Sequence, residues 1–173
     1  MNLIVTCARH LESETEEEMK TILEEMGDVN PTVKITNMSG ILTVDTALNP
    51  IDVVSKIREK ILDEPWSIRY CLRIIPIQKS IDTDYVNIEN EIVNMVGIIA
   101  DDESYRITIE KRNSDISSRE LITEIAKHIE NKVSLEHPDR IILIQILEGM
   151  AGISMINNSE ILSVEKSKRN LSE

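Results

Sequence analysis

The chain has 173 residues, of which 41% are hydrophobic, and a formal net charge of −12 at pH 7. This length and composition allow one ordinary domain or two small domains with a buried core. No apolar run reaches the roughly 18 residues of a membrane span, and the start is too short and too soon charged for a secretory signal, so the sequence predicts a cytoplasmic protein without a membrane partner.

The first half of the chain predicts the order strand, helix, strand, strand, helix, strand. Ser13 stands three residues before Glu16, the spacing of a capping box, which predicts a helix from there to Gly27. Asn49-Pro50 combines an N-cap residue with a proline at the first helical position. The predicted strands, each apolar or β-branched, are residues 2–7, 32–37, 41–45 and 67–75.

This order closes most simply as a ferredoxin-like sandwich, an α+β (α/β) fold with one antiparallel sheet and two helices. In that topology the first and fourth strands are neighbours, which brings Cys7 near Cys71. The cysteines are 64 residues apart and match no zinc motif, so we expect two buried, reduced thiols.

The second half begins after Pro76, where strand pairing ends and polar residues follow. Apolar residues at helical spacing predict a helix over 84–99. Alternation predicts a strand over 104–112, and Ser117 with Glu120 predicts a second capping box and a helix from Ser118. The remaining predicted elements are a buried strand over 140–147, a return strand at 153–156 and a last strand near 161–164.

The negative charge is concentrated on the first helix. Residues 12–28 contain eight acidic residues and one lysine, so the other parts of the chain carry little net charge. The plain interpretation is a solvated helix face, and the alternative is a surface for a basic partner. A basic corner elsewhere thus remains compatible with the overall charge of −12.

Three cations lie where the strand ending at Lys111-Arg112 leads into the helix that begins near Arg119. The free N–H groups and the dipole of a helix N-terminus favour an anion. The sequence therefore predicts a phosphate-binding corner formed by Lys111, Arg112 and Arg119.

The elements of the second half together resemble the THUMP domain, a tRNA-binding family. The resemblance is carried by Lys111-Arg112, the helix start Ser117 to Glu120, the stretch from Val133 to Ile146, and Ala151-Gly152-Ile153-Ser154. With the first half included, the chain is most similar to stand-alone THUMP proteins of the Tan type, which assist cytidine acetylation in tRNA. The chain is therefore expected to form a ferredoxin-like domain over 1–75 packed on a THUMP domain over 76–165. The tail over 166–173 has no apolar periodicity and is expected to be disordered.

The entry to the second half also resembles the Tan-type class. Arg73, Pro76, Ile77 and Lys79 follow its pattern of an arginine, a Pro-Ile pair and a lysine. The resemblance implies that Arg73 and Lys79 extend the RNA face, whereas the plain interpretation makes them linker charges. RNA-binding residues are thus expected at Arg73, Lys79, Lys111, Arg112 and Arg119.

The sequence shows no set of catalytic or metal-binding residues. The histidines, His10, His128 and His137, are scattered, and no nucleotide-binding loop or nucleophile motif occurs, so we expect no cofactor, no metal and no enzyme activity. With three Tyr, one Trp and no Phe, the base-stacking platform of an RRM is not expected either.

The resemblance implies an adaptor that holds tRNA near its acceptor end and presents it to a separate cytidine acetyltransferase. The alternative is a small-molecule-binding regulatory domain of ferredoxin-like type, because fold alone does not separate the two.

Overall fold

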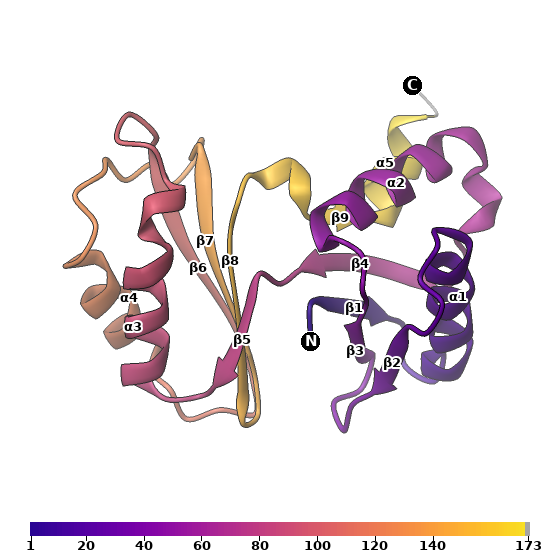
Figure 1. The fold of residues 1–173 in the computed structure, drawn as a ribbon, viewed down its shortest axis with the longest axis horizontal. Helices are drawn as coiled ribbons and strands as arrows, with labels where there is room; N and C mark the ends of the chain where they lie inside the picture. The colour runs from indigo at the N-terminus through magenta and orange to yellow at the C-terminus, as the bar shows by residue number, and fades with distance from the viewer. Residues whose placement is uncertain (172–173) are drawn as a thin grey trace. The chain divides into compact units, whose positions relative to one another are not determined.

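The computed structural model describes residues 1–171, which form two compact units (Figure 1). Unit 1 comprises Met1–Ile77 together with the chain from Ser159 onward, and unit 2 comprises Gln78–Asn158. The change of unit at Ile77 lies close to the change of pattern after Pro76, but the C-terminal segment belongs with the first half of the chain.

Unit 1 is an antiparallel sheet covered on one face by two helices. Its strand order is β2-β3-β1-β4-β9, and the first four strands have the ferredoxin-like arrangement, so the predicted α+β fold is confirmed. Buried side chains of both helices pack with those of the strands in one core. The elements are β1 (Leu3–Cys7), α1 (Glu12–Glu25), β2 (Thr32–Ile35), β3 (Ile41–Asp45), α2 (Pro50–Asp63), β4 (Cys71–Pro76) and β9 (Leu162–Ser163).

The central pairing of β1 with β4 places Cys7 opposite Cys71, as the topology predicted. Both thiols are buried and free. Burial raises the pKa of each thiol, so both remain protonated and unreactive at neutral pH.

The second helix starts as predicted, but the first does not. Asn49 caps α2 by accepting hydrogen bonds from the N–H groups of Ile51 and Asp52 at 3.0 and 3.1 Å. The predicted capping box at Ser13 is wrong, because α1 begins at Glu12, before Ser13, and its N-cap makes no side-chain hydrogen bond. The Glu12 carboxylate instead accepts from the N–H of Gly40 at 2.9 Å, a distant contact that local sequence does not encode, and this bond lowers the pKa of Glu12.

A carboxylate of α1 also holds the segment before β4. Glu18 accepts from the backbone N–H groups of Arg69, Tyr70 and Cys71 at 2.7, 3.2 and 2.9 Å. The strand predicted from residue 67 therefore starts only at Cys71, and a short 3-10 helix, η1 (Pro65–Ser67), precedes it. Part of the acidic helix thus stabilises the fold by pairing backbone donors.

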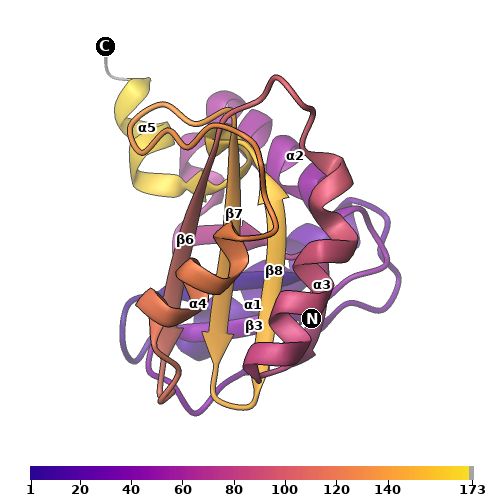
Figure 2. The same ribbon diagram turned by 90° about the vertical axis from the view of Figure 1, so that its left-hand side faces the viewer.

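Unit 2 is a four-stranded sheet of order β5-β8-β7-β6 with two helices on one face (Figure 2). β6 and β7 are parallel over eight residue pairs, and the other pairs in this sheet are antiparallel. The elements are β5 (Lys79–Asp82), α3 (Tyr85–Met95), η2 (Val96–Ile98), β6 (Tyr105–Arg112), α4 (Ser118–Ala126), β7 (Arg140–Leu147) and β8 (Met150–Ile156).

The C-terminal segment returns to the sheet of unit 1, where β9 pairs with β4 through Arg73↔Ser163 and Ile74↔Leu162 (Figure 1). After the short helix η3 (Asn158–Glu160) and β9, residues Val164–Asn170 form helix α5. The predicted second domain, 76–165, therefore differs from unit 2 at its end. The tail predicted to be disordered from residue 166 is instead helical to Asn170, and residues 172–173 lie outside the described part of the chain.

Two cations join the C-terminal segment to the rest of unit 1. The Arg58 guanidinium donates to the carbonyl oxygens of Ser159 and Ile161, and Lys168 Nζ donates to that of Ile68. Within residues 1–171 no helix is long and apolar enough to cross a membrane.

Asp28 is a buried carboxylate that fixes the turn after α1. It is 4% exposed and accepts from Thr46 Oγ1 at 2.5 Å, from the N–H of Ala47 at 3.0 Å and from the N–H of Asn30 at 3.1 Å. The hydrogen bond from Thr46 is the main reason that the pKa of Asp28 is lowered.

We predict that Asp28→Asn lowers the free energy of unfolding at pH 7 by about 2 kcal/mol, because a charged acceptor with three donors is lost. A carboxyl group with a lowered pKa stabilises the folded state above its unfolded pKa of about 4, and this stabilisation disappears as pH falls through the folded pKa. Urea unfolding at pH 7 and pH 3 should therefore show a smaller difference between variant and wild type at pH 3. Asp63→Asn, at an exposed position, is the control, and an equal difference at both pH values would contradict the prediction.

Candidate nucleic-acid interface

The candidate site lies where β6 ends and α4 begins. Parallel strands need a crossover connection, and here α4 provides the crossover between β6 and β7. The start of α4 consequently follows the carboxyl end of β6 after a loop of residues 113–117 (Figure 2).

Lys111 and Arg112 project to opposite faces of the sheet, as successive strand residues do. Lys111 lies on the side of the helices, where its Nζ donates to the carbonyl oxygen of Ile116 at 2.6 Å. Arg112 lies on the other side with Gln145, whose Oε1 accepts from the guanidinium at 3.3 Å, and with Glu110 at 3.9 Å. Lys111 is thereby held at the loop before α4, whereas Arg112 is not.

The helix start itself is well ordered. Ser117 Oγ accepts from the N–H of Glu120 at 3.3 Å, so the predicted N-cap is confirmed, but the capping box is not complete because the Ser117 N–H does not bond to the Glu120 carboxylate. The Tyr85 hydroxyl accepts from the N–H of Ser117 at 2.7 Å and lies 3.4 Å from Glu120 Oε2. The first N–H groups of α4, those of Ser118 and Arg119, have no intrahelical acceptor and can bind an anion.

Two of the five predicted cations, Lys111 and Arg119, belong to the segments that form this site. Arg119 lies in the first turn of α4, is exposed, and has no side-chain hydrogen bond or ion pair within the described residues. Together with Lys111 it supplies two positive charges at a helix N-terminus. We refer to Lys111, Arg119 and the first turn of α4 as the helix-start site.

Lys79 lies in the same sheet as this site but not next to it, and Arg73 belongs to the other unit. β5 is antiparallel to β8, β8 is antiparallel to β7, and β7 is parallel to β6, so β5 and β6 run in the same direction. Lys79 is at the start of β5 and Lys111 is near the end of β6, so the two residues lie at opposite ends of the sheet. Arg73 is in β4 of unit 1 and is partly buried. The expectation of one continuous basic corner therefore does not match the sheet geometry of unit 2.

Sequence reasoning missed the residues that line a hollow beside the helix-start site. Asn113 and Glu148 have positive φ angles of 54° and 51°, and Asn113 Nδ2 donates to Glu148 Oε1 at 2.9 Å. Asparagine adopts positive φ angles more readily than most residues, so Asn113 was the one feature of the sequence that could have predicted a turn here. The lining residues are Thr83, Tyr85, Asn113, Ser114, Asp115, Ile116 and Glu148.

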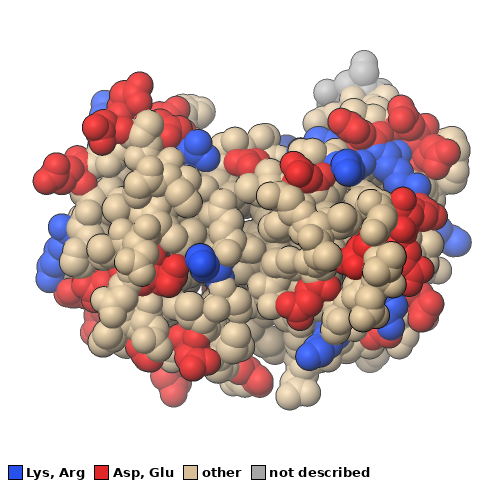
Figure 3. All heavy atoms as spheres, in the orientation of Figure 1, with Lys and Arg blue, Asp and Glu red and all other residues tan. Residues whose placement is uncertain are grey.

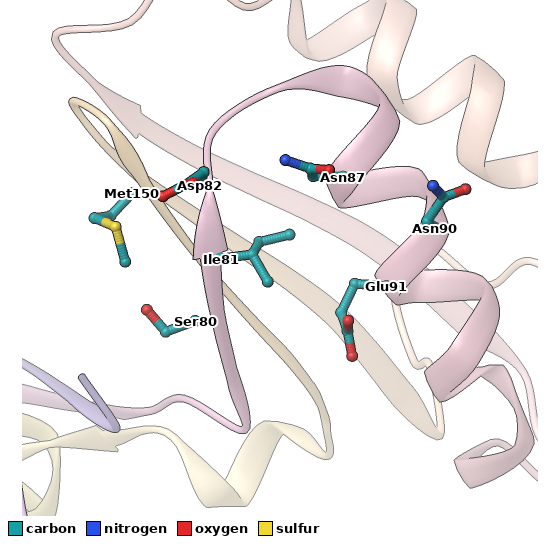
Figure 4. Close-up of a pocket in the computed structure, with 7 residues that line it drawn as sticks. All are labelled: Ser80, Ile81, Asp82, Asn87, Asn90, Glu91 and Met150. Atoms are coloured by element: carbon teal, nitrogen blue, oxygen red, sulfur yellow. The ribbon is translucent and has the colours of Figure 1, made fainter.

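A second hollow of unit 2 does not suit a phosphate. It lies between β5 and α3, where Ile81 points toward the helix while Ser80 and Asp82 project on the other side of the strand (Figure 4). Its charged lining groups are the carboxylates of Asp82 and Glu91, which repel an anion.

Unit 2 as a whole is acidic, with fifteen acidic and eight basic residues between Gln78 and Asn158. A uniform basic surface for nucleic acid is thus absent from unit 2. The helix-start site concentrates positive charge locally, which is sufficient for a small number of phosphate contacts. Among residues 1–171 no group of three or more His, Cys, Asp or Glu side chains could hold a metal ion.

Comparison with family models matches residues 91–155 to the THUMP domain. A THUMP domain is present in this chain. The matched range contains the last part of α3, all of β6, α4 and β7, and the greater part of β8, and therefore the whole helix-start site.

Solved structures share the fold over most of the chain. PH1313 from Pyrococcus horikoshii Ot3 is similar with a TM-score of 0.69 and 15% identity, over 91% of this chain and 55% of that one. TrmN from Thermus thermophilus has a TM-score of 0.57 and 8% identity, over 90% and 45%.

A 4-thiouridine synthetase, solved in complex with RNA and with bound ATP, has a TM-score of 0.52 and 11% identity, over 94% of this chain and 42% of its own. The chain thus spans about half the length of these three proteins. No curated protein matches the sequence.

We predict that Tyr85→Phe speeds amide hydrogen exchange at Ser117 by about fivefold, because the N–H loses its acceptor, and a hydrogen bond of this kind contributes about 1 kcal/mol. NMR-detected exchange measures this directly. Tyr70→Phe, in unit 1, is the control and should leave the Ser117 amide unchanged. Equal exchange in Tyr85→Phe and wild type would show that the hydroxyl does not order the start of α4.

Proposed function

We propose that this protein is a tRNA-binding adaptor that presents tRNA to a separate modifying enzyme, a cytidine acetyltransferase. The presence of a THUMP domain supports RNA binding. The similar fold of a 4-thiouridine synthetase in complex with RNA supports the same inference. The acetyltransferase partner and the tRNA acceptor end rest on the resemblance of the chain to Tan-type proteins.

The observation that carries the RNA-binding proposal is the helix-start site. Lys111 is held beside the first turn of α4 by its bond to the Ile116 carbonyl, and the Arg119 guanidinium extends from that turn. One phosphate group can accept from the free N–H groups of the turn while both cations neutralise it. Such contacts recognise backbone position and shape rather than bases.

The other expected cations have secondary places in the proposal. Arg112 lies on the opposite face of the sheet from Lys111, and Lys79 lies at its other end, so each would contact a different phosphate from the one at the helix-start site. Arg73, in unit 1, is proposed as a further contact.

We expect the double variant Lys111→Ala, Arg119→Ala to bind tRNA about tenfold more weakly at moderate salt. The slope of log affinity against log salt should fall by about two units if each cation neutralises one phosphate. Both residues are outside the core, so the far-ultraviolet circular dichroism and the melting temperature should stay close to those of wild type. Filter binding or fluorescence anisotropy at several salt concentrations provides the affinities.

The matched control is Lys127→Ala, Lys132→Ala, which removes the same charge from other exposed positions of unit 2. Binding that falls equally in both double variants would indicate attraction by net charge alone. Binding and slope unchanged in the Lys111, Arg119 variant would place the RNA elsewhere.

In the proposed adaptor role, this chain supplies the RNA contacts and the partner supplies the acetyl donor site and the chemistry. Acetylation of a tRNA cytidine by purified acetyltransferase should increase when the wild-type protein is added. Addition of the Lys111→Ala, Arg119→Ala variant should produce a smaller increase. The protein without the enzyme should produce no acetylcytidine. Equal acetylation with and without the protein would exclude the partner while leaving RNA binding intact.

A further inference from the structure

The only tryptophan of the chain is exposed to solvent. Trp66 lies in η1 and is 71% exposed, although a large aromatic side chain is ordinarily buried to a much greater extent. Exposed tryptophans are enriched among the residues that contribute most to binding at protein interfaces. The position of Trp66 therefore needs an explanation that the RNA site of unit 2 does not provide.

The segment that carries Trp66 is held firmly. On one side, the Glu18 carboxylate of α1 accepts from three consecutive backbone N–H groups, those of Arg69, Tyr70 and Cys71. On the other side, Lys168 of α5 donates to the carbonyl oxygen of Ile68. Pro65 restricts the backbone immediately before the tryptophan. A backbone held in this way loses little conformational entropy when a partner binds the side chain that it carries.

An acidic groove lies beside this segment, between α1 and the chain that leads from η1 to β4. Its lining includes Ser67, which follows Trp66 directly, the ring of Tyr70, the aliphatic Ile22 and the carboxylates of Glu14, Glu17 and Glu25. Figure 3 shows acidic side chains gathered over α1, at the right of unit 1. We call Trp66 and this groove the α1–η1 surface.

The carboxylates of this surface differ in how they are used. Glu25 pairs with Lys60 at 3.2 Å, and Glu18 is occupied by backbone donors. Glu14 and Glu17 are exposed and have no hydrogen-bonded or ion-paired partner within residues 1–171 through their side chains. Two free negative charges in this groove favour a cationic ligand and repel phosphate.

We propose that the α1–η1 surface docks an arginine- and lysine-rich segment of another protein. Basic side chains pair with Glu14 and Glu17, and the face of Trp66 receives a guanidinium group or an apolar side chain of the same segment. This proposal rests on the proposed adaptor role, because that role implies a partner protein that works on the bound tRNA. It places protein and RNA on different units, because the helix-start site belongs to unit 2.

The test uses Trp66 as its own reporter, because no second tryptophan contributes to the emission. The full-length protein is titrated with a peptide of about ten residues that contains several arginines and one leucine. We expect a change in tryptophan emission that saturates, and an affinity that falls as salt is raised. The same peptide with glutamate in place of arginine should cause no change.

Two variants test the residues. Glu14→Lys, Glu17→Lys retains the reporter and should weaken peptide binding by about tenfold or more. The matched control, Glu130→Lys, Glu136→Lys, makes the same charge change at exposed positions of unit 2 and should bind as wild type does. Trp66→Ala should also bind the peptide about tenfold more weakly, with the affinity measured by the fluorescence anisotropy of a labelled peptide.

Other outcomes overturn the proposal. No emission change at saturating peptide, or equal loss in both charge-reversal variants, removes the docking site. An emission change caused by a single-stranded oligoribonucleotide and not by the peptide would make Trp66 an RNA contact instead. Binding of tRNA, measured separately with the Lys111, Arg119 variant, shows whether the proposed function fails independently of this surface.

Discussion

The parallel pairing of β6 with β7 is the constraint on which the candidate RNA site depends. The register runs over eight pairs, from Tyr105↔Arg140 to Arg112↔Leu147. A parallel pair cannot be closed by a tight turn, so α4 crosses the sheet and its N-terminus follows the end of β6. For this reason strand-end Lys111 and helix-start Arg119 stand on either side of one short loop, which leads to the free N–H groups of a helix.

Charged residues of the same sign have different roles in this protein, depending on where they lie. In α1, Glu12 and Glu18 satisfy backbone N–H groups of other segments, while Glu14 and Glu17 stay exposed. The same helix thus stabilises the ferredoxin-like unit and presents free negative charge. In unit 2, positive charge at the helix-start site stands within an acidic surrounding, which limits the number of phosphates that it can attract.

Elements with a strong local signal could be predicted from the sequence. Asn49-Pro50 and Ser117 mark helix starts that the structure confirms, because a cap is an interaction between residues two or three apart. The start of α1 and the start of β4 could not be predicted in the same way, because each depends on a distant contact: Glu12 with Gly40, and Glu18 with residues 69–71. Helix α5 does have a local cap, Ser163, but the stretch that follows has no apolar periodicity that would predict a helix.

The sequence by itself determined the order of the elements in the first half of the chain, its ferredoxin-like topology, the placing of Cys7 beside Cys71 and the presence of cations at the end of β6, but it did not predict β5 or α5. Periodicity and capping encode these features within short stretches of chain. Only the tertiary structure decided that Lys111 bonds to the loop before α4, that Arg112 turns to Gln145 on the other face, and that β9 returns to β4. These outcomes depend on strand alternation, strand direction and pairing between residues far apart in the chain, which are settled when the sheets assemble and not before.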